Sequence, residues 1–201
     1  MKAIDPIVHG IEHVDRVRKW AIKIGKIEKS VDMFILEVTA LLHDIGRAYE
    51  KEMGLNHWEA GRIVAKKYLE SLNFFSKNEI DAISQTVYEH GPGGASNLTK
   101  IVQDADRMDL WGAIGVARAF SHRHCLPFYK DKDCFKYRHL SQKEIDAIFQ
   151  KQNFQCVLDD LNISLNIYES VNTKTAKKFA REKIEFQKMF IKQLKKETID
   201  L

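Results

Sequence analysis

The stretch FILEVTALLHDIG, residues 34–46, joins a mostly apolar run to two polar groups at its end. The run predicts a buried helix, and Ile45-Gly46 supplies a turn after it. His43 and Asp44 are neighbours, so on a regular helix their side chains diverge by about 100°. Both can face one point only where the backbone turns, at the helix end. We therefore expect His43 and Asp44 to share a site there.

Two other segments carry groups of the same chemistry. His13 lies upstream in EHVDRV, residues 12–17, and an acidic cluster, DADRMD, lies downstream at residues 104–109. Imidazole and carboxylate together bind first-row divalent metals, and an octahedral ion with four such ligands keeps positions open for water and a substrate oxygen. The pattern predicts a divalent metal site (Mn, Co, Ni, Fe, Zn or Mg). The helical spacing leaves both Asp104 and Asp106 open as the fourth ligand.

The bulk composition is that of a globular protein. The chain has 201 residues, 44% of them hydrophobic and 30% charged, which suffices for one buried core. No apolar run approaches the roughly 20 residues that span a bilayer, and the N-terminal residues lack a signal-peptide core. Three irregularly spaced cysteines fit a reducing compartment. We expect a cytoplasmic protein with no membrane partner.

The hydrophobic pattern is helical nearly throughout, and we find no alternating strand pattern. The sequence predicts an all-α fold, a single domain over residues 1–201. Its expected parts are a helical core at about 5–120, a loop or lid at about 121–140, and C-terminal helices at about 141–201. Five expected helices span about residues 6–24, 57–72, 77–90, 98–120 and 175–197. A further helix is expected to begin after an N-cap at Asp32 or Ser30, and another at the capping box Ser141-x-x-Glu144.

Positive charge gathers at the C-terminal end. Residues 170–201 hold nine Lys or Arg and four Asp or Glu, whereas the rest of the chain is nearly balanced. Because acidic residues interleave with the basic ones, we interpret this segment as a solvated helix face, and nucleic acid is not an expected partner. Assembly of like chains stays an open alternative.

The four groups also resemble a known family. A histidine, then His-Asp, then a later Asp on an all-helical chain is similar to the HD-domain superfamily of metal-dependent phosphohydrolases, especially its small stand-alone members. The resemblance implies His13, His43, Asp44 and Asp106 as metal ligands, since the family's last ligand directly precedes an arginine. It also implies a hydrolase in which metal-activated water, with Asp44 and Asp106 as catalytic residues, cleaves a phosphate or pyrophosphate bond. The expected substrate is a nucleotide or another small phosphate ester.

Four further residues are candidate substrate contacts. Arg47 and Arg107 follow the ligands, and a guanidinium holds phosphate by paired hydrogen bonds. His57 and His90 stand at places similar to the additional histidines of dinuclear members, so they suit substrate contact or a second ion. Glu89 occupies the place of another histidine in those members, which favours one ion. The general acid stays open between Glu89, His90 and Asp109.

Two other functions remain alternatives. A non-catalytic sensor or interaction domain would keep the metal or nucleotide without turnover. A cyclic-dinucleotide phosphodiesterase is less favoured, because residues 91–94 are GPGG rather than the Gly-Tyr-Pro motif of that branch. Guanosine-tetraphosphate hydrolysis is also disfavoured, since Arg47 and Ala48 stand where those enzymes carry acidic residues.

Overall fold

The computed structural model describes residues 9–151 and 153–200, and within them every regular element is a helix. The all-α prediction is therefore confirmed. The chain divides into two compact units: the first takes residues up to Met108 together with Asn172–Ala176, and the second takes Asp109–Val171 and the residues from Lys177 onward. A single domain over residues 1–201 stays a prediction.

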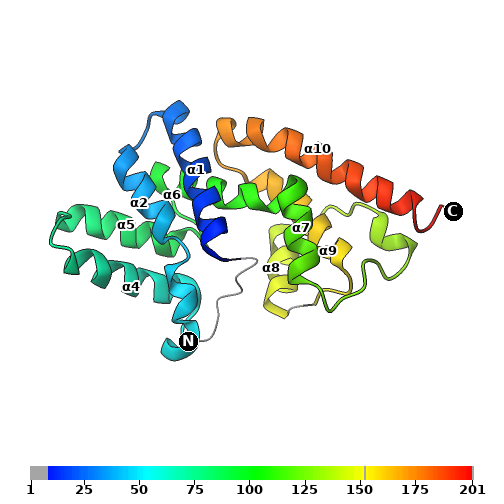
Figure 1. Cartoon of the computed structure of the whole chain (residues 1–201), viewed down its shortest axis with the longest axis horizontal. Coiled ribbons are helices and arrows are strands. Elements are labelled where there is room, and N and C mark those ends of the chain that lie inside the picture. The colour runs from blue at the N-terminus through cyan, green and yellow to red at the C-terminus, as the bar shows by residue number, and fades with distance from the viewer. Residues whose placement is uncertain (1–8, 152, 201) are drawn as a thin grey trace. The chain divides into compact units, whose positions relative to one another are not determined.

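The first unit contains residues 34–46, the apolar run that ends in His43 and Asp44. Its elements are α1 (Ile11–Glu28), α2 (Met33–Leu42), the 3-10 helix η1 (Ile45–Ala48), α3 (Glu50–Met53), α4 (His57–Ser71), α5 (Lys77–Glu89) and α6 (Asn97–Arg107). α4 and α5 run side by side, and α1 packs on α2 and α6 (Figure 1). A core that includes Leu69, Ile83 and Val87 packs against Leu42 and Ile45. This packing fixes the end of α2.

Capping residues place the helix starts as the sequence predicts. The Asp32 carboxylate accepts from the backbone N–H groups of Phe34 and Ile35. Capping boxes open α4 at Asn56 and α5 at Ser76, and α5 ends at Glu89 with His90 as its C-cap, directly before the GPGG stretch. These predictions are confirmed, because a capping box satisfies backbone N–H groups that a helix start otherwise leaves unpaired.

The predicted end of the first helix at Gly25 is wrong. α1 continues to Glu28, and Lys29 takes the left-handed conformation (φ 52°) with its N–H donating to the Gly25 carbonyl. Gly25 is instead buried, and a Cβ there would overlap the Leu36 side chain. The glycine thus serves the close packing of α1 on α2. The predicted start at Asp5-Pro6 lies outside the described residues.

The predicted single helix at 98–120 is also wrong. α6 ends at Arg107, the 3-10 helix η2 (Met108–Leu110) follows, and α7 (Gly112–His122) is a separate helix. Gly112 has φ 74°, which side-chain-bearing residues rarely adopt, so the helix breaks there. A Cβ at Gly112 would lie 3.2 Å from the Lys183 side chain of α10 (Lys174–Lys196). α10 therefore packs closely on the start of α7.

The second unit is built on α7, α9 (Val157–Ile167) and most of α10, with η3 (Lys132–Phe135), α8 (Gln142–Lys151) and η4 (Tyr168–Ser170) around them. Residues 123–141 are irregular apart from η3, as expected for a loop. The inner face of α10 carries the buried residues Ala180, Ile184 and Ile191, whereas Phe186 is exposed. No helix in the described part has the length and apolar content needed to cross a membrane.

Candidate metal centre

Three elements of the first unit bring the four predicted ligands together. His13 comes from α1, His43 and Asp44 from the end of α2, and Asp106 from α6. The His13 Nε2 atom lies 3.3 Å from His43 Nε2 and 3.3 Å from Asp106 Oδ1. Both histidine Nε2 atoms lie 3.7 Å from Asp44 Oδ2, and His43 Nε2 lies 4.0 Å from Asp106 Oδ1. We call these residues the four-residue cluster.

A tight turn after α2 makes this convergence possible. α2 ends at Leu42, and η1 begins directly after Asp44. A Cβ at Gly46 would overlap the His57 carbonyl oxygen and the Gly61 N–H, so only glycine lets η1 lie against α4. The expectation that Ile45-Gly46 turns the chain and lets His43 and Asp44 face one point agrees with this geometry.

Backbone carbonyls orient two of the histidine rings. His43 Nδ1 lies 2.8 Å from the Ala40 carbonyl oxygen, and His90 Nδ1 lies 2.6 Å from the Val87 carbonyl oxygen. Because a carbonyl only accepts, each Nδ1 carries the proton and each Nε2 presents a lone pair. Burial lowers the pKa of His43, which favours its neutral form. A metal-binding histidine needs this arrangement.

The dimensions of the cluster fit a divalent ion. Ligand atoms about 2.1 Å from one ion lie about 3.0 Å apart at right angles and about 4.2 Å apart when opposite each other. The separations of 3.3 to 4.0 Å fall within these limits. In addition, the buried Asp44 Oδ1 atom has no hydrogen-bond partner among the described residues. Two imidazoles and two carboxylates with an orphaned oxygen suit Mn, Fe, Co, Ni or Zn.

Both carboxylates of the cluster are held in their charged form. Burial alone would raise the pKa of Asp44, but the neighbouring His43 and a hydrogen bond from His9 outweigh it and hold that pKa well below its ordinary value. Burial also opposes ionisation of Asp106, yet the hydrogen bond and charge of His13 lower its pKa. Ionised carboxylates are the form that binds a cation.

A second group of possible ligands shares Asp44. Nitrogen atoms of His57 and His90 lie within 4.8 Å of each other and of an Asp44 oxygen, and His90 Nε2 is 3.8 Å from Asp44 Oδ1. His57 Nδ1 lies 3.2 Å from a Glu50 carboxylate oxygen. Burial and nearby Arg47 lower the pKa of His57 to about 3, so its ring is neutral. Glu50 is not predictable from the sequence, because its spacing to His57 follows no motif.

His9 also reaches the cluster. Its Nδ1 atom lies 2.9 Å from Asp44 Oδ2, and His9, His13 and Asp44 together form a third possible ligand group. His9 lies four residues before His13, and this spacing predicts either an additional or alternative ligand or, in preference, a plain histidine at the helix start. The contact with Asp44 depends on the tertiary fold, so spacing alone could not reveal it.

Arg47, Arg107 and Asp104, the alternative to Asp106 as fourth ligand, have different neighbours. Arg47 Nε lies 2.7 Å from Asp44 Oδ2. Arg107 Nη1 lies 3.8 Å from Asp104 Oδ1, and burial lowers the pKa of Arg107. Asp104 is fully buried and accepts hydrogen bonds from Asn172 and from the Thr173 N–H. Asp104 thus ties the chain segment at 172–173 to α6, while Asp106 faces the histidines.

The other acid candidates are engaged elsewhere. Glu89 accepts hydrogen bonds from Gln85 and Thr99. Asp109 belongs to the second unit, where its carboxylate pairs with Arg118 at 3.5 Å. Of the three residues considered as general acid, His90 is the one with a contact to Asp44.

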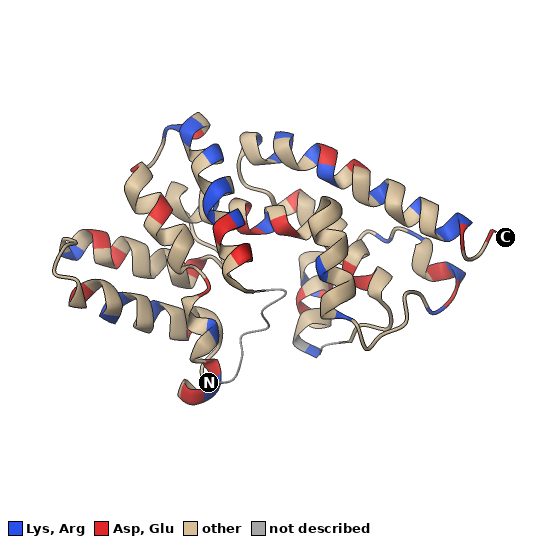
Figure 2. Cartoon of the chain, viewed as in Figure 1, with Lys and Arg blue, Asp and Glu red and all other residues tan. Residues whose placement is uncertain are grey.

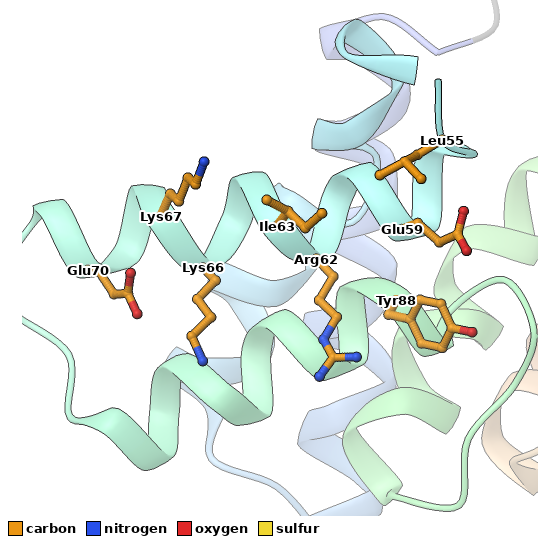
Figure 3. Close-up of a pocket in the computed structure, with 8 residues that line it drawn as sticks. All are labelled: Leu55, Glu59, Arg62, Ile63, Lys66, Lys67, Glu70 and Tyr88. Atoms are coloured by element: carbon orange, nitrogen blue, oxygen red, sulfur yellow. The ribbon is translucent and has the colours of Figure 1, made fainter. Parts of the chain in front are cut away.

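A separate hollow of about 640 Å³ lies along the outer face of α4 (Figure 3). Its lining includes Arg62, Lys66 and Lys67 but also Glu59 and Glu70, so charges of both signs face it. None of its lining residues belongs to the four-residue cluster. The hollow therefore gives no information on the metal centre.

Comparison with known proteins defines the class. The model of the HD domain family matches residues 10–111, which contain all four cluster residues. Because this match spans half of the chain, the chain belongs to the HD domain family. Its matched solved structures include a predicted HD superfamily hydrolase from an uncultured Thermotogales bacterium, with a TM-score of 0.63 and 28% identity over 94% of this chain and 81% of the other.

One similar protein is known from both sequence and structure. The uncharacterized protein YpgQ of Bacillus subtilis is 29% identical over 203 residues, covering 94% of this chain and 84% of YpgQ. A crystal structure of YpgQ in complex with ADP has a TM-score of 0.66 and 28% identity, over 95% of this chain and 90% of that one. The likeness thus extends beyond the HD domain match to most of the chain.

Proposed function

We propose that this protein is a metal-dependent phosphohydrolase that cleaves a phosphate or pyrophosphate bond of a nucleotide or a small phosphate ester. The observation that carries the proposal is the convergence of His13, His43, Asp44 and Asp106 with an orphaned carboxylate oxygen. Membership of the HD domain family supports a hydrolase. The ADP complex of YpgQ supports a nucleotide as the substrate class.

The four cluster residues would hold the divalent cation, which supplies a Lewis acid for the phosphoryl oxygen and acidifies a neighbouring water. The protein's own part is to bind and orient the phosphate. Arg47 forms an ion pair with Asp44, and the terminal nitrogens of its guanidinium can donate to phosphate oxygens. Arg107, which directly follows Asp106 in sequence, would be a second guanidinium donor to the phosphate.

His57 and His90 would have a role different from the phosphate binding proposed for the two arginines. With Nδ1 bound to Glu50, the neutral His57 ring has a lone pair rather than an N–H at Nε2, so it can accept a hydrogen bond from a water or a substrate hydroxyl. His90 likewise presents Nε2 toward Asp44. We infer that both histidines contact the water or the substrate, and that His90 is the proton carrier to be tested first.

A metal-dependence screen tests this function. The protein is stripped of metal, and phosphate and pyrophosphate release are measured from nucleoside mono-, di- and triphosphates with Mn, Co, Ni or Mg added singly. The variant His13→Ala should lose turnover by at least a hundredfold, whereas Asp81→Asn, on the surface of α5, should keep it. Turnover that survives chelation, or that His13→Ala retains, would rule the proposal out.

A further inference from the structure

A small groove in the second unit is lined by aromatic, apolar and lysine side chains, which together suit a ligand with an aromatic ring and a phosphate group. It has a volume of about 230 Å³ and lies between the 121–140 loop, α9 and α10. Leu165 and Ile191, both largely buried, contribute its apolar lining, and Phe135 and Tyr137 bring aromatic rings. We call this feature the lysine groove, after the lysines that complete its lining. It shares no residue with the four-residue cluster.

The aromatic side of the groove is held in place. The Tyr137 hydroxyl donates to Asn166 Oδ1 at 3.2 Å, and the Leu140 N–H donates to the same atom at 2.8 Å. Asn166 in turn donates to the Arg138 carbonyl. Tyr137 is nevertheless 54% exposed. A fixed but exposed ring offers a stacking surface at little cost in side-chain entropy.

The charged side of the groove is cationic. Lys188, Lys192 and Lys195 lie on one face of α10, and no acidic residue lines the groove. Lys188 has a partner in Glu185 at 3.1 Å, and Lys195 has one in Asp200 at 3.4 Å. Within the described part of the chain, Lys192 has no acidic side chain at ion-pair distance. The groove therefore has positive charge that its own residues leave uncompensated.

The dimensions and the pattern of charge favour a small ligand over a polymer. A hollow of 230 Å³ is smaller than pockets that enclose drug-sized ligands, so it suits one ring system while charged groups stay at the rim. Acidic residues interrupt the basic residues along α10 (Figure 2). A nucleic acid strand needs a longer continuous positive track.

We propose that the lysine groove binds a free nucleotide, with its base against Tyr137 and Phe135 and its phosphate at Lys192. This site goes beyond the proposed hydrolysis and does not depend on it, because binding in the groove requires neither metal nor the cluster residues. The protein would then hold a nucleotide at a place where no hydrolysis occurs.

The test uses the full chain in chelator, so that no turnover occurs, with adenosine monophosphate as the probe. Methyl NMR follows Ile191, which lines the groove, and Ile45, which follows Asp44. Adenosine monophosphate should shift the Ile191 signal and bind at least tenfold more tightly than adenosine or inorganic phosphate. Lys192→Gln should weaken this binding at least fivefold. Lys178→Gln, an exposed α10 lysine outside the groove, should leave it unchanged.

Several results would overturn the groove site. These are a shift confined to Ile45, equal effects of the Lys192 and Lys178 variants, or binding of inorganic phosphate as tight as that of the nucleotide. Tight binding of a ten-residue oligothymidylate without binding of adenosine monophosphate would assign the groove to nucleic acid instead. Because Lys192 lies outside the cluster, Lys192→Gln should hydrolyse substrate as the unmodified protein does. If the unmodified protein hydrolyses no substrate, that result contradicts the proposed hydrolysis but leaves the test of nucleotide binding in the groove valid.

Discussion

At the scale of single residues, Asp44 is the point at which all the candidate chemistry meets. Its Oδ2 atom contacts His9 and Arg47, and it lies near both histidines of the four-residue cluster. Its Oδ1 atom faces His90 and has no hydrogen-bond partner in the described part of the chain. A buried carboxylate with this many cationic or polar neighbours is expected at a functional site rather than in a packing role.

Glu50 is expected to position His57. Its carboxylate holds the Nδ1 proton of His57, and Glu50→Gln would remove the charge that favours this tautomer. Loss of such supporting hydrogen bonds typically costs about 10–100-fold in activity or metal affinity. We expect kcat to fall in that range while KM changes little. Glu52→Gln, on the same short helix, is the matched control, and equal kcat values for the two variants would refute a positioning role.

The stability of the metal-free protein should depend on pH through His57. Its pKa is about 3 when folded against an ordinary value of 6.5, so the unfolded chain binds more protons between these values. Stability is therefore lost as pH falls below about 6.5, by about 2 kcal/mol between pH 7 and pH 5 from this residue. Urea unfolding in chelator measures the loss. His57→Gln should flatten the pH dependence, whereas exposed His124→Gln should not.

At the scale of elements, the approach of η1 to α4 depends on Gly46. A methyl group at this position would overlap backbone atoms of His57 and Gly61, which cannot move aside as a flexible side chain can. We expect Gly46→Ala to destabilise the fold by about 2–3 kcal/mol, as overpacking does, and to weaken metal binding. Gly54→Asn is the control, because its left-handed position has open space around it. Urea unfolding that shows equal losses for both variants would contradict this role of Gly46.

Local signals predicted the starts of elements better than their ends. Asp32, Asn56 and Ser76 cap helices through contacts within three residues, so the sequence alone contains the whole interaction. Gly25 was expected to end its helix, but it is buried where α1 packs on Leu36 of α2, and no local pattern reveals that contact. Gly112 lies inside the predicted helix at 98–120, but its positive φ marks the break between η2 and α7.

At the scale of the whole molecule, residues distant in sequence decide between the two aspartates of the acidic cluster. The family resemblance favoured Asp106, while helical spacing left Asp104 open. Asp104 is bound by Asn172 and Thr173, nearly seventy residues away, and no local rule foresees that contact. The order of the ligands along the chain was predictable, whereas the separate task of Asp104 required the fold.

The two aspartates should therefore give opposite results on substitution. Asp104→Ala leaves the partly buried donors of the 172–173 segment without their carboxylate acceptor, which we expect to cost about 1–3 kcal/mol of stability while metal affinity is kept. Asp106→Ala should abolish metal-dependent turnover with little loss of stability in the metal-free state. Urea unfolding and Mn²⁺ titration of both variants distinguish these outcomes, and a swap of the two phenotypes would make Asp104 the ligand.

The most direct test of the metal centre is an anomalous diffraction map from crystals of this protein grown with Mn²⁺. We expect one strong anomalous peak bounded by His13, His43, Asp44 and Asp106, within about 2.0–2.3 Å of their nitrogen and oxygen atoms. The same peak should vanish from crystals of His43→Ala. A map at saturating Mn²⁺ with no peak among these four residues, or with its strongest peak elsewhere, would contradict the metal centre and the hydrolysis proposed from it.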